Sequence, residues 1–250
     1  MKTVSIIIPT LNEGTCLART LRCLSILHPS ASEVIVVDGG SCDETVVIAK
    51  SFHSLNLTPK IKILHSPQAN RALQMNLGAQ QAKGDILCFL HGDTLVPDDL
   101  IALITTTLAN PTVACGGFIS LMTGQTTRWI TSLHNSLKTY YAPLLFRPRL
   151  FIFKRFRLLF GDQVIFCRRT DFLACGGYDA TLAIMEEADL CMKLCQKGRI
   201  IQLNRTVQSS DRRVAKWGTL KAIAIYFAIG SLWGLGVSDK VLKRFYNDIR

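Results

Sequence analysis

Residues 4–13, Val-Ser-Ile-Ile-Ile-Pro-Thr-Leu-Asn-Glu, form an apolar run that ends in polar residues. The β-branched run over 4–8 is typical of a parallel strand that helices cover on both faces. Similar runs that end in a polar loop stand at 34–41, Val-Ile-Val-Val-Asp-Gly-Gly-Ser, and at 84–94, Gly-Asp-Ile-Leu-Cys-Phe-Leu-His-Gly-Asp-Thr. These three stretches predict buried parallel strands with polar residues at their carboxyl ends.

Helical patterns separate the predicted strands. They begin near residue 17, near residue 43, at 69–82 and after Pro97, and a further short strand is expected at 61–64. Strands that alternate with helices predict a parallel sheet with right-handed crossovers. Ligands of such sheets bind at the carboxyl ends of the strands.

The pattern is less regular beyond residue 110. We expect strands at 113–121, 164–167 and 200–203 and a helix at 187–196, whereas 129–160 shows no clean period. Residues 220–237 are almost wholly apolar. At that length the stretch is a short membrane helix, an interfacial helix or a buried helix.

The composition limits the class of protein. The chain has 250 residues, 48% of them hydrophobic, which excludes a disordered chain and suffices for a sizeable core. Its net charge of +11 suggests an anionic partner: nucleic acid, lipid head group or phosphorylated substrate. The nine cysteines form no Cys-x-x-Cys pair. The apolar run near the amino terminus is too short for a signal peptide, so we expect a cytoplasmic protein.

Acidic residues stand at or just past the predicted strand ends: Glu13, Asp38, Asp93 and the run 186–189. Carboxylates that converge on one crevice can bind a hard divalent cation and hydrogen-bond a sugar or ribose. Each of them alone is equally typical of an ordinary turn or helix N-cap. Their recurrence in order favours a functional site.

The three quoted stretches resemble the family 2 glycosyltransferases of GT-A fold. Three further motifs are similar to small bacterial and cyanobacterial members of that family: Asn-Arg-Ala-Leu-Gln-Met-Asn at 70–76, Gly-Asp-Gln at 161–163 and Ser-Asp-Arg-Arg at 210–213. The resemblance covers about residues 3–215. It implies an α/β GT-A domain over 1–216, with a mostly parallel sheet flanked by helices, and an apolar helical tail over 217–250.

The resemblance also implies how the donor binds. A nucleotide-sugar would contact Pro9, Thr10, Asn12 and Glu13 with its base and ribose, Asp38 and Gly39 with its base, and Arg71 with its pyrophosphate. The family's metal motif is Asp-x-Asp, whose last carboxylate binds Mg²⁺ or Mn²⁺; here the motif reads His91-Gly92-Asp93. Asp93 is then the expected ligand, and His91 is either a second ligand or a positioning residue.

The family's catalytic base is the Asp of a Glu-Asp pair, which matches Glu186-Glu187. Glu187 is therefore the first candidate for the base and Glu186 the second; the alternative is an acid-rich helix start stabilised by the helix dipole. Asp162 and Gln163 are expected to begin a strand on the acceptor side. Arg212 and Arg213 either reach the diphosphate or form a solvated basic turn.

Residues 147–157 mix five basic side chains with three aromatic ones, and 101–160 hold seven basic and no acidic residues. This favours contact with an anionic membrane surface. The alternatives are single-stranded nucleic acid, which we do not expect because no recognised module surrounds the segment, and a loop over the acceptor site with buried Phe residues. The protein would then sit at the inner face of a membrane.

The sequence thus predicts an inverting transferase that moves a sugar from a nucleotide-diphosphate-sugar, first of all a UDP-sugar, to a hydroxyl or carboxyl group. The apolar tail favours a lipid or carotenoid acceptor over another small molecule. Two alternatives are a sugar-phosphate nucleotidylyltransferase and a membrane-associated nucleotide-sugar-binding protein without catalysis. Neither the sugar nor the oligomeric state follows from the sequence.

Overall fold

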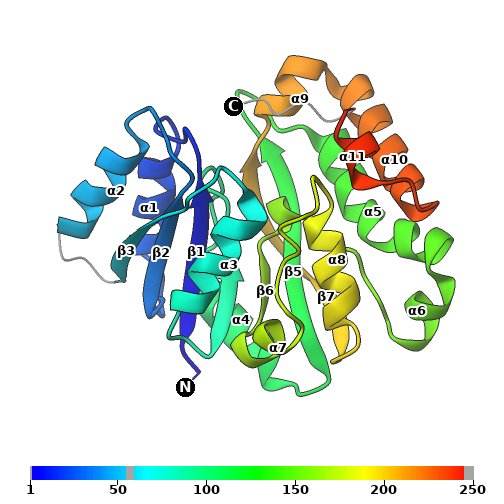
Figure 1. Ribbon diagram of the computed structural model, residues 1–250, viewed down its shortest axis with the longest axis horizontal. Helices are drawn as coiled ribbons and strands as arrows, with labels where there is room; N and C mark the ends of the chain where they lie inside the picture. Colours follow the sequence, from blue (N-terminus) through cyan, green and yellow to red (C-terminus); the bar gives the residue numbers. More distant parts are fainter. Residues whose placement is uncertain (1, 55–58, 245–250) are drawn as a thin grey trace.

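The computed structural model describes residues 2–54 and 59–244. Its sheet has seven strands in the order β3-β2-β1-β4-β6-β5-β7 (Figure 1). The strands are β1 Val4–Thr10, β2 Glu33–Asp38, β3 Lys60–His65, β4 Ile86–Phe89, β5 Val113–Thr123, β6 Ile165–Arg168 and β7 Arg199–Ser210. Strand β6 runs antiparallel to both β4 and β5, and the other pairings are parallel. The predicted mostly parallel sheet is confirmed.

Helices join and cover these strands (Figure 1). They are α1 Leu17–Ser25, α2 Thr45–Ser54, α3 Arg71–Gln81, α4 Leu100–Ala109, α5 Trp129–Phe146, α6 Pro148–Phe153, α7 Arg169–Ala174, α8 Glu186–Leu194, α9 Arg212–Trp217, α10 Thr219–Gly234 and α11 Asp239–Lys243. None of the helices in these described parts of the chain is long and apolar enough to cross a membrane.

Successive residues of β1 enter two different cores, because side chains alternate across a strand. Ile6 and Ile8 pack with apolar residues of α1 and α4 on one face of the sheet. Ile7 packs with residues of α3 and α8 on the other. A Cβ on Gly78 of α3 would lie 2.5 Å from Ile7, so only glycine lets this helix approach β1 so closely. Burial on both faces explains the unbroken apolar run over 4–8.

One stretch without a predicted element is helical, and one prediction for local structure was wrong. The stretch 129–160, which shows no clean period, contains α5 and α6. Asp162 and Gln163 do not begin a strand; they lie in the 3₁₀ turn Gly161–Gln163, and β6 starts at Ile165. Gln163 is held there because its Oε1 accepts a hydrogen bond from the backbone N–H of Phe160 at 3.1 Å and its Nε2 donates to Thr139 at 3.0 Å.

The carboxyl-terminal helices are packed onto the sheet domain. Helix α10 lies beside α5 (Figure 1) and is formed by part of the apolar stretch 220–237. The predicted domain boundary at residue 216 falls just before it, and residues 245–250 of the predicted tail lie outside the described residues. Residues of α10 also line the cavity described next.

Candidate active site

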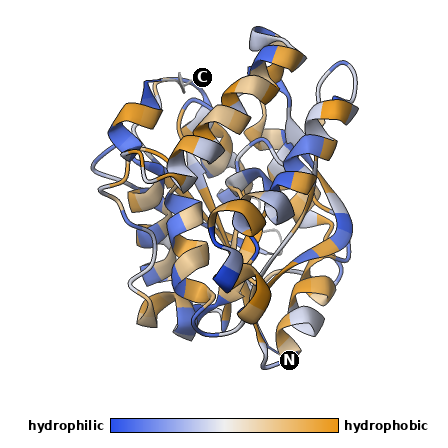
Figure 2. Ribbon diagram, turned by 90° about the vertical axis from the view of Figure 1, so that its right-hand side faces the viewer, coloured by the Kyte–Doolittle hydropathy of each residue, from blue (hydrophilic) through white to orange (hydrophobic). Residues whose placement is uncertain are grey.

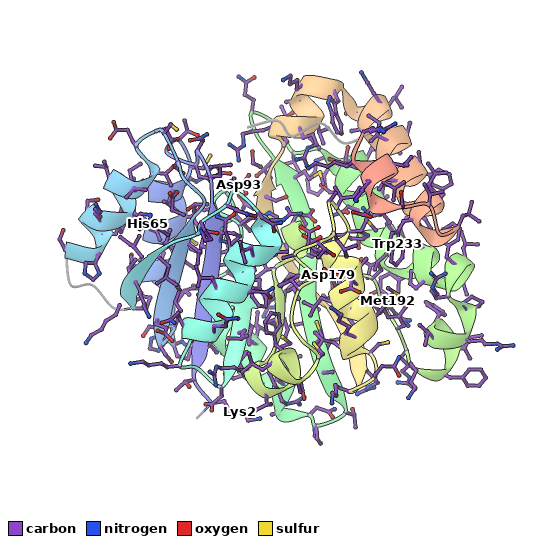
Figure 3. The ribbon with its side chains drawn as sticks, viewed as in Figure 1. Lys2, His65, Asp93, Asp179, Met192 and Trp233 are labelled. Carbon is purple, nitrogen blue, oxygen red and sulfur yellow. The ribbon has the colours of Figure 1, made fainter. Side chains whose placement is uncertain are left out.

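A cavity of about 370 Å³ lies at the carboxyl ends of β1 and β4. Figure 3 shows Asp93 at this end of the sheet, with Lys2 at the opposite end. Twelve of the predicted site residues line the cavity: Pro9, Thr10, Glu13, Arg71, His91, Gly92, Asp93, Asp162, Glu186, Glu187, Arg212 and Arg213. Asn12, Asp38, Gly39 and Gln163 are not among its lining residues.

Asp38 ends β2 and holds the loop that follows it. Its Oδ2 accepts hydrogen bonds from the backbone N–H groups of Gly40 and Ser41, both at 3.0 Å, and its Oδ1 accepts one from the Ser41 hydroxyl at 2.5 Å. Asn12 joins the same loop through its Oδ1, which accepts from the backbone of Cys42 at 2.9 Å. The Asp38 carboxylate thus binds its own loop. Its predicted contact with a nucleotide base stays a prediction.

Arg212 joins the ends of three distant segments. Its Nη2 lies 2.8 Å from Oε2 of Glu13, which follows β1, and 2.9 Å from Oδ2 of Asp93, which follows β4. Arg212 itself begins α9, directly after β7. A single guanidinium thus balances two carboxylates that sheet topology brings together. Arg212 thus lies at the cavity and not in a solvated turn, and its contact with a diphosphate stays a prediction.

Arg71 makes the second such cluster with the two glutamates of α8. Its Nη2 lies 2.6 Å from Oε1 of Glu186 and 3.1 Å from Oε1 of Glu187. Both carboxylates are buried, with 5% and 6% of their surface exposed. Oε2 of Glu186 is buried and has no hydrogen-bond partner among the described residues. The predicted start of α8 at this pair is confirmed.

The environment of Glu187 favours a protonatable carboxyl near neutral pH. Burial raises the pKa of Glu187 to about 7; the nearby Arg71 guanidinium lowers it, and Glu186 and Asp162 raise it. A general base works best when its pKa is close to the working pH. Glu187 therefore has the protonation behaviour that such a base requires.

His91 and Glu187 approach each other across Gly161. A Cβ on Gly161 would lie 2.6 Å from both Nε2 of His91 and Oε1 of Glu187, so a larger residue would displace one of them. Burial, followed by the charge of Arg71, lowers the pKa of His91 to about 4. The imidazole is therefore neutral, and its Nε2 has no hydrogen-bond partner among residues 2–54 and 59–244.

A divalent cation fits this site only together with a substrate phosphate. The described residues contain no group of three or more His, Cys, Asp or Glu side chains arranged to hold a metal. Mg²⁺ commonly takes one or two carboxylates and completes its shell with phosphate and water oxygens. Asp93 can supply such a carboxylate, whereas Nε2 of His91 lies beside Glu187. Of the two predicted ligands, Asp93 therefore suits such a cation better than His91 does.

Helix α5 contributes cavity residues that were not predicted. Asn135 and Lys138 line the cavity, and Nδ2 of Asn135 donates to Oδ2 of Asp162 at 2.6 Å. A signal was present in the sequence: polar residues stand at 131, 135, 138 and 139, the spacing of one helix face. The buried residues of α5 are mostly polar, with Ala142 and Pro143 towards its end.

Backbone strain accompanies the site. Met185, the residue before Glu186, has φ = 68°, and the β-branched Val164, directly after the 3₁₀ turn, has φ = 53°. Side chains disfavour this left-handed region, by about 1–3 kcal/mol. Both residues adjoin segments that carry cavity residues, Glu186 and Asp162. Such strain is often found where a fold positions functional groups.

A mostly parallel sheet with carboxylates and arginines around a cavity at its strand ends defines an α/β protein of GT-A fold. Among solved structures, a mannosyltransferase from Pyrobaculum calidifontis in complex with GDP-Man and Mn²⁺ is similar, with a TM-score of 0.67 at 18% identity, over 99% of this chain and 65% of that one. Glucosyl-3-phosphoglycerate synthase from Mycobacterium tuberculosis, in complex with Mn²⁺, UDP and phosphoglyceric acid, has a TM-score of 0.63 at 18% identity, over 95% and 80%.

Residues 5–174 match the family described as glycosyl transferase family 2, and the chain belongs to that family. Glycosyltransferase AglE of Haloferax volcanii is 39% identical over 92 residues, 36% of this chain and 30% of that one. A PGL/p-HBAD biosynthesis glycosyltransferase of Mycobacterium bovis is 37% identical over 101 residues, 40% and 39% respectively. The chain thus spans well under half the length of these relatives. The predicted family and fold are confirmed.

Proposed function

We propose that the protein is an inverting glycosyltransferase that moves a sugar from a nucleotide-diphosphate-sugar to a hydroxyl or carboxyl group of an acceptor. The observation that carries this proposal is the buried Glu187 carboxylate, which faces the cavity with a pKa raised to about 7. Membership of the family favours this reaction over the nucleotidylyltransferase alternative. A UDP-sugar is the first donor to test.

In the proposed reaction, Glu187 accepts the proton of the acceptor hydroxyl. The acceptor oxygen forms a bond to C1 of the sugar from the face opposite the leaving group, and the bond between C1 and the diphosphate oxygen breaks. The nucleoside diphosphate leaves with the electron pair. Arg71 keeps part of Glu187 ionised, because its guanidinium lowers the pKa that burial raises. Glu186 holds Arg71 in place through two contacts to one oxygen.

The donor would lie along the ends of β1 and β4. Pro9 and Thr10 line the cavity there for the base and ribose, and Arg212 and Arg213 supply positive charge for the diphosphate. A divalent cation, Mg²⁺ or Mn²⁺, would be held by Asp93 and would stabilise the charge of the departing diphosphate. Arg212 already balances Asp93 and Glu13, so phosphate oxygens are expected to compete for this guanidinium when donor binds.

A donor screen tests the proposed function. Thermal shift with UDP-, GDP- and dTDP-sugars, with and without Mn²⁺, should raise the melting temperature with at least one of them, since a ligand that binds only the folded state stabilises it. Release of the nucleoside diphosphate should follow for the same donor. Binding without release or transfer for any acceptor would favour the non-catalytic alternative instead.

The protein is further proposed to dock on an anionic membrane through an apolar face. This face comprises side chains of α5, α6, α10 and the residue directly after α10 that are more than half exposed: Trp129, Ile130, Leu133, Leu137, Leu145, Ile152, Phe153, Leu220, Phe227 and Leu235. The three helices lie on one side of the molecule, which Figure 2 turns toward the viewer and colours as hydrophobic over long stretches. Exposed apolar side chains gathered in this way are typical of an interaction surface.

Charge supports the choice of an anionic membrane as partner. The stretch that forms α5 and α6 lies within 101–160, which hold seven basic and no acidic residues. Arg149, Lys154 and Arg155 are exposed beside Ile152 and Phe153. Cations next to exposed rings suit lipid head groups and the interface below them. A position at the inner face of a membrane, with a lipid or carotenoid acceptor, is the corresponding proposal for location and substrate.

The part played by residues 217–244 follows from the packing of α10. Tyr226, Ile229 and Gly230 of this helix line the cavity, and α10 packs against α5. Removal of everything after residue 216 would therefore open the cavity as well as remove apolar surface. Point variants on the apolar face test membrane docking more cleanly than truncation does.

A further inference from the structure

Lys138 is a buried ammonium group inside the cavity. It stands in the middle of α5, only 8% of it is exposed, and it lines the cavity together with Phe160 and Tyr226. Its Nζ lies 3.5 Å from the centre of the Phe160 ring and 5.3 Å from that of Tyr226. Among residues 2–54 and 59–244 it has no carboxylate within 4.0 Å.

Burial of a charged ammonium group costs free energy. Burial lowers the pKa of Lys138 to about 8, although Asp162 and Glu187 partly oppose this shift. The group is still mostly charged at pH 7. Aromatic faces attract a cation, but they leave its three N–H donors without strong acceptors. Buried charges are normally paired with an opposite charge. The described residues form no ion pair with Lys138, so its ammonium group can bind the anion of a ligand.

Asp162 and Glu187, the two acids whose charges act on Lys138, both have other partners. Asp162 accepts the hydrogen bond from Asn135, one turn before Lys138 on the same face of α5. Glu187 is paired with Arg71. Because the charge of Glu187 acts on Lys138, the ammonium group lies near the proposed base. Neither Asp162 nor Glu187 forms an ion pair with it.

We propose that Lys138 binds a phosphate group of the acceptor, while a hydroxyl of the same molecule meets Glu187. The acceptor class is then a hydroxylated anion. This inference rests on the proposed function, because it assumes that Glu187 receives the hydroxyl proton. A free phosphorylated metabolite and a phospholipid head group both carry this chemistry.

Binding measurements that need no turnover test the proposal. The ligands are glycerol, glycerol phosphate and monomeric short-chain phosphatidylglycerol, each titrated calorimetrically in the presence of UDP. The variants are Lys138→Met, which removes the charge at similar length, and Lys138→Arg, which keeps it. Lys83→Met, at an exposed lysine outside the cavity lining, is the matched control for loss of one positive charge.

We expect wild type and Lys83→Met to bind at least one phosphate-bearing ligand more tightly than glycerol. Lys138→Met should bind that ligand about 10- to 100-fold more weakly, since hydrogen bonds to charged groups are strong, and Lys138→Arg should recover much of the loss. A Lys138-dependent preference for glycerol phosphate identifies a soluble acceptor; one confined to phosphatidylglycerol identifies a lipid head group.

Equal binding of glycerol and both phosphate-bearing ligands by wild type would overturn the proposal. So would unchanged binding in Lys138→Met. Failure of the proposed function is distinguishable from both results: it would show as absence of nucleoside diphosphate release from every donor, whatever the phosphate-bearing ligands do.

Discussion

Helices α4 and α5 both flank the sheet, but they face it in opposite ways. Helix α4 buries the apolar residues Leu100, Ile101, Ile104 and Leu108. Helix α5 buries mostly polar ones: Thr131, Ser132, Asn135, Lys138 and Thr139, with the apolar Ala142 and Pro143 towards its end. Its exposed residues include Trp129, Ile130, Leu133 and Leu137.

The buried polar residues of α5 make hydrogen bonds, while Ala142 near its end packs in an apolar core. The Ser132 hydroxyl accepts from the backbone N–H of Met122 in β5 at 2.9 Å, and Asn135 donates to Asp162. A helix so arranged has one side available for the cavity and leaves its apolar side to something other than the core. The contrast indicates that α4 contributes to stability, whereas the two sides of α5 are the ones proposed to contact substrate and membrane.

The largest expected difference between α4 and α5 is the effect of a substitution on the free energy of unfolding. Ile104→Ala in α4 removes a fully buried side chain, so we expect the free energy of unfolding to fall by about 2–5 kcal/mol. Leu137→Ala in α5, where the side chain is 52% exposed, should change it by about 0.5 kcal/mol or less. Urea unfolding measures both. Similar losses in the two variants would mean that α5 packs on its apolar side as α4 does.

Membrane affinity should depend on the apolar side of α5 and α6. Phe153, which is 81% exposed, should enter the interface, so Phe153→Asp is expected to weaken binding to anionic vesicles by roughly 10-fold or more. Vesicle flotation with phosphatidylglycerol measures this. Val47→Asp, on α2 and likewise exposed at 60%, is the control and should float as wild type does. Equal flotation of the two variants would contradict docking through this face.

The pH dependence of turnover should report Glu187. Burial raises its pKa to about 7, and only the ionised form accepts a proton, so kcat/KM should fall about 10-fold for each unit of pH below that value. Arg71, Glu186 and Asp162 surround this carboxyl, and Arg71→Met should move the fall to higher pH because the guanidinium lowers the pKa of Glu187. A rate independent of pH between 5 and 8 would contradict the assignment.

The same titration affects stability in the opposite direction. Between the ordinary glutamate pKa of 4.5 and the raised value of about 7, the folded chain holds more protons on Glu187 than the unfolded chain does. This carboxyl therefore lowers stability as pH rises through that window. Glu187→Gln should lose this dependence, and differential scanning calorimetry across the window checks it. An unchanged dependence in the variant would assign the effect to other groups.

The sequence predicted the first four strands well, because burial on both faces imposes unbroken apolar runs such as Ile6 to Ile8. It also placed Glu13 and Asp93 at one site, because the strand ends of a parallel sheet meet at one edge, whereas Glu187 was found through the resemblance to the family. The pairing of Arg212 with Glu13 and Asp93, and of Arg71 with Glu187, joins residues far apart in the chain. No local pattern contains such pairs.

Lys138 was missed for a related reason. Periodicity identifies a helix by its apolar side and assumes that this side is buried. In α5 the assumption fails, because Asn135 and Lys138 face the cavity while Leu133 and Leu137 face outward. The sequence also did not indicate that β6 is antiparallel, because a short buried strand has the same apolar pattern in a parallel and in an antiparallel pairing.

The central claim is that Glu187 is the base of a sugar transfer in this cavity. The most direct test compares nucleoside diphosphate release by wild type and Glu187→Gln at pH 8, with the donor found by thermal shift and with Mn²⁺ present. We expect the variant to bind the donor as wild type does but to release the nucleoside diphosphate about 10² to 10⁴ times more slowly. Release at the wild-type rate would contradict the claim.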